Sequence, residues 1–217
     1  TETASISLAA QIEHVLIATP LSNRPIATSY VRQGQLDRVN AKAENGNRPP
    51  LLLLHGFDSS VLEFRRLFPL LAENQEVWAI DLLGFGFTER LAGVPYSPDA
   101  IKAHLYSFWQ QLIQRPVILV GASMGGAAAI DFTLTYPTAV NKLVLLDTAG
   151  YKAIAAIGKF LFPPFDRLAV DFLRRPQVRQ QISRSAYYNK SLATADANLC
   201  ASPQLNLPGW HDALKTF

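Results

Sequence analysis

The chain has 217 residues, of which 49% are hydrophobic and 17% charged, so it can form one sizeable domain with its own core and is not disordered as a whole. The net charge is +3. The positive excess lies in residues 151–217, which contain nine Lys or Arg and four Asp or Glu. These basic residues alternate with long apolar side chains instead of forming a polar stripe, which argues against nucleic acid as a partner.

Cysteine, histidine and hydropathy exclude further classes of protein. A single cysteine, Cys200, excludes an intramolecular disulfide framework and fits a reducing compartment, and four scattered histidines lack the spacing of a zinc site. The charge-free run 116–130 is shorter than the roughly 20 residues of a membrane-spanning helix. TETASISLAA at the start lacks the basic region of a signal peptide. We expect a soluble or peripheral protein with no metal and no cofactor.

The predicted elements begin with two strands, at 12–19 and 26–34, joined as a hairpin-like pair by a turn containing Ser22, Asn23 and Pro25. A polar loop over 41–50 follows. Short apolar runs then predict buried strands at 51–55, 76–81, 116–121 and 142–148. Apolar side chains at helical spacing predict helices at 59–74, 97–113 and 125–137. This alternation predicts an α/β fold, with a mostly parallel sheet and helices on both faces.

Residues 151–217 differ from the part before them. The segment 151–182 has helical apolar spacing broken at Pro163 and Pro164, and no later strand is predicted. We therefore divide the chain into the N-terminal part of an α/β core, 1–150, and a helical cap or lid, 151–217. Two more strand–helix units would need roughly 60 or more residues, so the C-terminal part of the core is predicted to be missing.

A nucleophile is predicted at Ser123. Residues 121–125, Gly-Ala-Ser-Met-Gly, match the pattern G-x-S-x-G directly after a predicted strand and before an alanine-rich helix. A sharp strand-to-helix turn requires small residues two positions to either side of the serine and lifts its oxygen clear of the sheet. The start of the helix also directs N–H groups and its dipole toward developing negative charge. The alternative is a glycine-rich turn that merely packs the helix close to the strand.

The run His55-Gly56-Phe57 follows the strand that precedes the first core helix. The backbone N–H groups of Phe57 and Met124 are predicted to form an oxyanion hole. We interpret His55 as a residue that shapes this turn and not as the catalytic base. His104, in a predicted helix, and His14, in a predicted strand, are interpreted as structural or surface residues.

Four segments carry a resemblance to a known family. LLLLHGFDSS, VWAIDLLGFGFTER, PVILVGASMGG and KLVLLDTAG, in this order, resemble the α/β-hydrolase superfamily over residues 12–150. More narrowly, HGFDSSVLEFRRLFPLL, FWQQLIQRPVILVG and LPGWHDALKTF resemble the chlorophyll dephytylase group of plants and cyanobacteria. That resemblance implies hydrolysis of the phytyl ester of chlorophyll through an acyl-enzyme, in a protein associated with photosynthetic membranes.

The groups that would activate Ser123 depart from the family's pattern, in which an acid and then a histidine follow the serine. Asp147 ends the strand 142–148, where some members of the superfamily carry the acid, and it is equally well interpreted as a turn aspartate. His211 is the only histidine after Ser123, but it lies at the start of a predicted cap helix beside Asp212, which disfavours it as the base. We expect the usual acid and histidine to lie outside these 217 residues.

Several functions follow from these expectations. A serine ester hydrolase acting on a lipophilic ester explains both the serine turn and the oxyanion turn. A non-catalytic ligand-binding protein of the same fold, or a C–C bond hydrolase of the same superfamily, remains an alternative, whereas dehalogenase or epoxide hydrolase chemistry needs an Asp in place of Ser123.

The cap is rich in apolar residues followed by Arg174, Arg175 and Arg179. These residues predict either a lid that touches an anionic membrane or a lid packed on its own core with a solvated basic face. The protein would accordingly be cytoplasmic or peripheral to a photosynthetic membrane.

Overall fold

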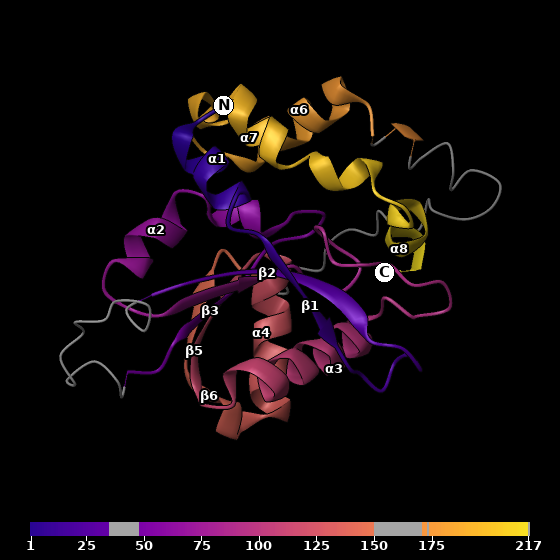
Figure 1. Cartoon of the computed structure of the whole chain (residues 1–217). Coiled ribbons are helices and arrows are strands. Elements are labelled where there is room, and N and C mark those ends of the chain that lie inside the picture. The colour runs from indigo at the N-terminus through magenta and orange to yellow at the C-terminus, as the bar shows by residue number, and fades with distance from the viewer. Residues whose placement is uncertain (35–47, 150–170, 173, 217) are drawn as a thin grey trace.

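A six-stranded sheet forms the centre of the computed structural model, which describes residues 1–34, 48–149, 171–172 and 174–216 (Figure 1). The strand order is β1-β2-β4-β3-β5-β6. The strands are β1 (Glu13–Ile17), β2 (Ile26–Gln33), β3 (Leu51–Leu54), β4 (Val77–Ile80), β5 (Val117–Ala122) and β6 (Val140–Leu146). β1, β2 and β4 pair antiparallel, and β4, β3, β5 and β6 pair parallel, which confirms the predicted hairpin-like pair and the mostly parallel sheet.

Helices cover both faces of the sheet, as predicted (Figure 1). Leu52 and Leu54 of β3 pack with α3 (Pro98–Phe108) and α4 (Met124–Thr135), while Leu51 and Leu53 pack on the opposite face with α2 (Leu67–Ala72). Successive side chains of a strand point to opposite faces, so a strand that is apolar at every position must be covered twice. The run LLLL is therefore buried throughout.

The predicted helix 59–74 is two separate elements, which corrects the sequence prediction. A 3-10 helix, η3 (Val61–Phe64), ends before α2 begins at Leu67. Pro69 explains the break, because a proline ring clashes with the carbonyl group four residues earlier and that residue, Arg65, lies between the two elements. The predicted helix 97–113 likewise changes character, since its last turn is a π-helical segment, η4 (Trp109–Ile113).

Strand β6 is an edge of the sheet in the described part of the chain. It pairs with β5 alone there, and its apolar residues Val144, Leu145 and Leu146 are 40%, 40% and 38% exposed. The corresponding residues of the inner strands β3 and β4 are buried. The short 3-10 helix η5 (Pro137–Ala139) links α4 to this strand.

The described residues after 170 are helical. They comprise α6 (Pro176–Ala186), α7 (Ala195–Cys200) and α8 (Trp210–Thr216), with the 3-10 helices η7 (Lys190–Leu192) and η8 (Pro203–Asn206) between them. We call this described segment the cap. It lies on the same side of the molecule as the N-terminal helix α1 (Thr3–Ala9), away from α3 and α4 (Figure 1). The apolar run 151–170 and its two prolines lie outside the described residues.

No helix among the described residues combines the length and the hydropathy that crossing a membrane requires.

Candidate active site

Ser123 occupies the turn between β5 and α4 in a conformation that few residues adopt. Its φ is 51° and its ψ is −116°, which for a residue with a side chain is strained backbone. The carbonyl oxygen of Ser123 accepts hydrogen bonds from the N–H groups of Gly126 and Ala127 and so begins α4. The N–H groups of Met124 and Gly125 lie outside the helix's own hydrogen bonds, because the first turn of a helix has no carbonyl partners. The serine side chain is exposed at this turn.

Glycines around Ser123 are required by contact with backbone atoms. A Cβ on Gly125 would lie 2.5 Å from the His55 carbonyl oxygen, and one on Gly121 would lie 2.6 Å from the Gly125 carbonyl carbon. Real Cβ atoms do not approach backbone so closely, and the packed backbone at the end of β3 and at the start of α4 cannot yield. The two glycines of G-x-S-x-G therefore permit α4 to pack against the ends of β3 and β5.

The turn after β3 faces Ser123. A Cβ placed on Gly56 would lie 3.4 Å from the Cβ of Ser123, so the two segments are in contact at this point. Glu63, in η3, accepts a hydrogen bond from the Gly56 N–H at 3.0 Å and fixes the first residue of the turn. Phe57 follows, with a half-exposed side chain whose ring packs edge-on against Phe85 at 5.6 Å. The structure thus brings the turn that contains Phe57 against the turn that contains Ser123 and Met124, at the carboxyl ends of β3 and β5.

Glu63 is a residue that the sequence interpretation missed. The signal available was Ser60-x-x-Glu63, the capping-box pattern, in which the glutamate returns to the N–H of the capping residue. Ser60 does accept from the Leu62 N–H, but Glu63 extends to Gly56 instead.

His55 is buried and shapes the turn. Its Nε2 accepts from the Leu82 N–H at 3.0 Å, so its proton is on Nδ1, which donates to the Gly56 carbonyl oxygen at 2.7 Å. Both ring nitrogens are therefore used inside the fold, as expected for a structural histidine. Asp81, at the end of β4, is likewise buried, and it accepts from the N–H groups of Val61 and Phe87. Burial raises the pKa of Asp81, and the nearby His55 opposes that rise.

The other three histidines lie in three different elements, α3, β1 and α8. His104 is buried in α3, where its Nε2 lies 2.9 Å from the hydroxyl oxygen of Thr28, and burial lowers the pKa of His104 to about 4. His14 is exposed on β1. His211 is in α8 with its Nδ1 3.5 Å from a carboxylate oxygen of its neighbour Asp212, and its buried Nε2 has no hydrogen-bond partner among the described residues.

Asp147 is exposed directly after β6, with a φ of 47°. Because β6 pairs with β5, Asp147 and Ser123 follow neighbouring strands, and the Ser123 N–H donates to the carbonyl oxygen of Leu146 at 3.0 Å.

The sequence of this chain is similar to those of known hydrolases. Residues 49–212 match the alpha/beta hydrolase fold family. The alpha/beta hydrolase domain-containing protein VTE7 of Arabidopsis thaliana is 37% identical over 173 residues, which are 79% of this chain and 52% of VTE7. Lipase 1 of Psychrobacter immobilis is 38% identical over 112 residues, 50% of this chain and 35% of the lipase. The 2-hydroxy-6-oxo-2,4-heptadienoate hydrolase of Pseudomonas putida is 36% identical over 104 residues, 46% of this chain and 38% of that enzyme.

A solved structure shares the fold. The meta-cleavage product hydrolase of Pseudomonas fluorescens IP01 aligns with a TM-score of 0.73 at 22% identity, covering 94% of this chain and 67% of that one. The chain spans about half or less of the length of the curated relatives named above. Together with the parallel sheet and the strained serine turn, the match over residues 49–212 shows that the chain belongs to the alpha/beta hydrolase fold family.

Proposed function

We propose that the protein is a serine hydrolase of a lipophilic carboxylic ester. Ser123 attacks the ester carbonyl as its proton passes to a base, and the N–H groups of Phe57 and Met124 stabilise the oxyanion. The ester C–O bond then breaks, the alcohol leaves with that proton, and water hydrolyses the acyl-enzyme to the carboxylic acid and free Ser123. The observation that carries the proposal is the strained turn at Ser123, with its oxygen-bearing side chain exposed beside the Gly56 turn. Strain of this kind concentrates at functional sites.

The proton acceptor for Ser123 is proposed to come from residues outside this chain. His55 and His104 are buried and hydrogen-bonded within the core, His14 is exposed on the first strand, and His211 is in the cap. Since VTE7 is about twice as long as the segment that matches this chain, it has room for such a histidine outside that segment. Asp147 is our candidate for the acid, because it is exposed at the end of the strand beside β5.

The substrate class proposed is a long-chain ester, with the phytyl ester of chlorophyll as the specific candidate. Support comes from the sequence resemblance to the chlorophyll dephytylase group, from the 37% identity to VTE7 and from the lipase relatives. The test is turnover by the full-length protein of chlorophyll and of short p-nitrophenyl esters, with Ser123→Ala as the control. Release of phytol by the wild type alone supports the proposal, and hydrolysis of short esters only would restrict it to general esterase activity.

A C–C bond hydrolase is the second candidate function. The 36% identity to 2-hydroxy-6-oxo-2,4-heptadienoate hydrolase over 104 residues favours it. Turnover of a 2-hydroxy-6-oxo-dienoate, measured as the loss of its absorbance, would favour this candidate over the esterase. A non-catalytic ligand-binding protein is the remaining alternative, and it predicts no reaction of the full-length protein with a fluorophosphonate.

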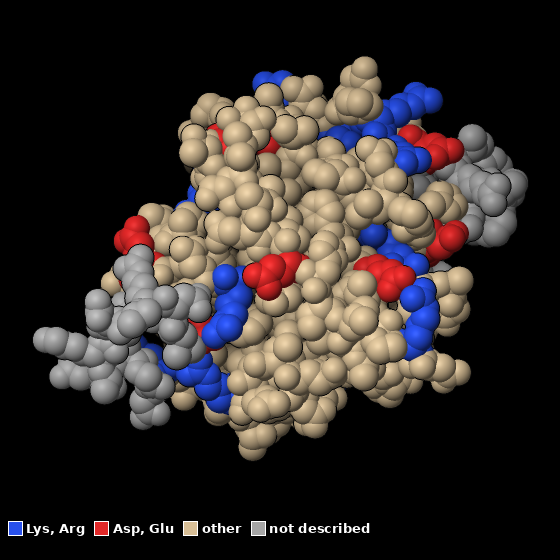
Figure 2. Space-filling model, viewed as in Figure 1, with Lys and Arg blue, Asp and Glu red and all other residues tan. Residues whose placement is uncertain are grey.

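We further propose that the cap contacts an anionic membrane surface. Lys and Arg side chains gather at the top of the molecule over α6 (Figure 2), where Arg174, Arg175 and Arg184 are exposed. Large apolar side chains of the cap are exposed as well: Phe172, Ile182, Tyr188, Leu192 and Leu199. Exposed basic and apolar groups in the same segment favour adsorption to negatively charged bilayers.

Sedimentation with vesicles tests this contact. Binding to phosphatidylglycerol vesicles that exceeds binding to phosphatidylcholine vesicles, and that falls in the Arg175→Gln, Arg184→Gln variant, supports it. Equal binding to the two kinds of vesicle would remove the membrane proposal, which would leave a cytoplasmic enzyme with a solvated basic face.

A further inference from the structure

Asp58 lies between the oxyanion turn and the cap. It directly follows Phe57, it is only 8% exposed, and its φ is 49°. Aspartate tolerates this left-handed conformation better than most residues, because its short polar side chain bonds locally. A carboxylate so far removed from water must be paired, since an isolated buried charge is strongly disfavoured.

The partners of Asp58 come from three separate elements of the cap. One carboxylate oxygen accepts from the guanidinium of Arg179 in α6, and the other accepts from the indole N–H of Trp210 in α8 at 2.9 Å. Its backbone carbonyl oxygen accepts from the side-chain amide of Gln204 in η8 at 2.9 Å. Gln204 is fully buried and Trp210 is 4% exposed. A single residue of the core turn therefore holds α6, η8 and α8 together.

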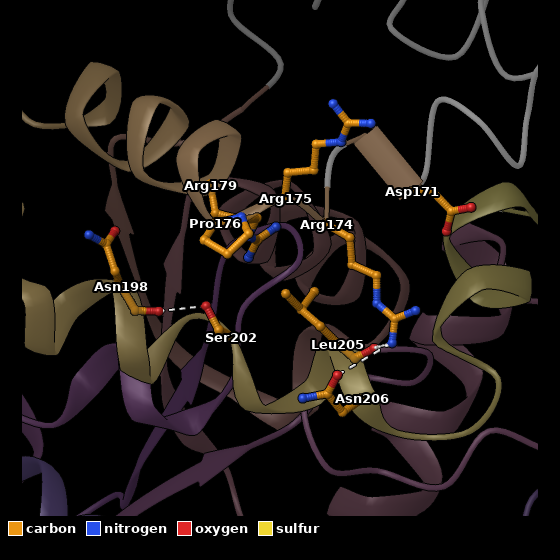
Figure 3. Close-up of a pocket in the computed structure, with 9 residues that line it drawn as sticks. All are labelled: Asp171, Arg174, Arg175, Pro176, Arg179, Asn198, Ser202, Leu205 and Asn206. Carbon is orange, nitrogen blue, oxygen red and sulfur yellow. Dashed lines mark hydrogen bonds between the residues drawn. The ribbon is translucent and has the colours of Figure 1, made fainter.

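The cap side of this contact is connected within itself. Arg179 and Gln204 both donate to the carbonyl oxygen of Ala201, at 2.7 and 2.9 Å. Arg179 points from the first turn of α6 inward, whereas Arg175 points away from the hollow that these residues line (Figure 3). The guanidinium of Arg174 lies over the Trp210 ring at 5.7 Å. Contacts within the cap thus hold the donors of Arg179 and Gln204 in the orientation that Asp58 requires. A buried ion pair is favourable only when its geometry is fixed in this way.

The two residues that flank Phe57 are each fixed by a carboxylate. Glu63 binds the Gly56 N–H from the core side, and the Asp58 carboxylate binds the cap. The Phe57 N–H belongs to the peptide between Gly56 and Phe57, so its direction is set by the ψ angle of Gly56 and the φ angle of Phe57. Glu63 fixes Gly56, and the contacts of Asp58 fix the residue after Phe57 and so restrict the Phe57 dihedral angles from the other side. Displacement of a reacting group by about 1 Å can reduce a rate about a hundredfold.

We propose that Asp58 is a positioning residue for the oxyanion hole. Through Arg179 and Trp210 it uses the cap to hold the turn in the geometry that directs the Phe57 N–H at the oxyanion. The catalytic consequence rests on the function proposed above, in which Ser123 is the nucleophile. Loss of the contact lowers kcat and leaves KM nearly unchanged, since substrate binding by the rest of the site is retained.

Two variants of the full-length protein test the role. Asp58→Asn keeps the shape and tolerates the positive φ but removes the charge that Arg179 meets, and Trp210→Phe removes only the indole donor while keeping an aromatic ring. We expect each to lower kcat for a p-nitrophenyl ester about tenfold, and to slow fluorophosphonate modification of Ser123 by a similar factor, with KM changed less than about twofold. Trp210→Phe serves if Asp58→Asn does not fold.

Asp196→Asn is the matched control. Asp196 in α7 pairs with Arg65 at 3.0 Å, so it is a second buried cap-to-core ion pair with no contact to the oxyanion turn. This variant should lower Tm without changing kcat or the rate of modification. An indole N–H spectrum reports the contact directly, because each of the three tryptophans, Trp78, Trp109 and Trp210, donates to a different acceptor. Asp58→Asn should shift the Trp210 signal alone.

The outcomes separate this inference from the proposed function. If the wild type reacts at Ser123 and both variants react equally fast while their Tm falls as in Asp196→Asn, Asp58 has a structural role only and the inference is overturned. If the wild type does not react with the fluorophosphonate, the proposed function fails and the catalytic role of Asp58 fails with it. An unchanged Trp210 signal in Asp58→Asn would contradict the contact itself.

Discussion

At the scale of single residues, close contact with neighbouring backbone allows only glycine at position 125, two residues after the proposed nucleophile Ser123. Gly125→Ala would place a methyl group against the Leu54 and His55 carbonyl groups at the end of β3. We expect a loss of about 3 kcal/mol in the free energy of unfolding, measured by urea denaturation, because the packed backbone at the end of β3 cannot move away. Gly93→Ala is the comparison: nothing lies within 4 Å there, and the cost is the positive φ alone, about 1–2 kcal/mol. Equal losses in the two variants would contradict this account.

His104 gives a pH-dependent contribution to stability. Burial lowers its pKa in the folded protein to about 4 from the ordinary 6.5. Between these values the unfolded chain binds a proton that the folded chain does not, so the free energy of unfolding should fall by up to about 3 kcal/mol as the pH falls from 6.5 to 4. Urea denaturation of the wild type and of His104→Gln should therefore give curves of stability against pH that diverge in this window, and parallel curves would refute the assignment.

Individual residues were predictable where a local pattern imposes a backbone geometry. The G-x-S-x-G spacing requires small residues at Gly121 and Gly125, and the structure shows why. The contacts of Asp58 could not be assigned from the sequence, because Arg179 and Trp210 lie more than a hundred positions away. A capping-box pattern marked Glu63, but its partner Gly56 depends on how the side chain extends across the turn. The roles of Ser123 and Asp147 stay predictions.

At the scale of elements, the ends of helices were predicted best where capping residues mark them. The predicted helix 97–113 opens with Ser97-Pro98-Asp99, a helix-start pattern, and Ser97 is the N-cap of α3. Pro69 was a signal that the predicted helix 59–74 divides into η3 and α2. The helical spacing of the leucines favoured a single helix instead, and that prediction was wrong. Strand positions were correct to within a few residues, since apolar runs bounded by polar segments leave little freedom.

The N-cap of α3 provides a test at this scale. The Ser97 hydroxyl oxygen accepts from the Ala100 N–H at 3.3 Å. Ser97→Ala should lower the free energy of unfolding by about 1 kcal/mol, and Ser97→Asp, which retains a capping oxygen, should lose much less. Thermal denaturation measures both. A similar loss in the two variants would show that the cap hydrogen bond does not stabilise α3.

At the scale of the whole molecule, two buried ion pairs of opposite polarity join the cap to the core. The cap supplies the cation to Asp58 and the anion, Asp196, to Arg65. The parallel arrangement of the sheet followed from alternating strands and helices, but these pairs did not, since they join residues 121 and 131 positions apart. The segment 151–170, on which the prediction of an apolar lid rested, lies outside the described residues.

Asp196→Ala tests the attachment of the cap. The carboxylate of Asp196 accepts from Arg65, from the Ser5 hydroxyl at 2.7 Å and from the Glu2 N–H at 2.7 Å. Its removal leaves a buried guanidinium unpaired, which should cost about 3–5 kcal/mol and expose the cap to proteases before the core. Arg24→Ala, which breaks an exposed pair with Glu89, should change stability by less than about 1 kcal/mol. Limited proteolysis with peptide mapping distinguishes the two, and cleavage that starts in the core would contradict the prediction.

The central claim is that Ser123 is a nucleophile, and the position of a covalent adduct tests it most directly. The full-length protein is treated with a fluorophosphonate, digested, and mapped by mass spectrometry. We predict a single adduct on the peptide that contains Ser123, and none in the Ser123→Ala variant. An adduct on a different residue, or ester hydrolysis that persists in Ser123→Ala, would contradict the claim.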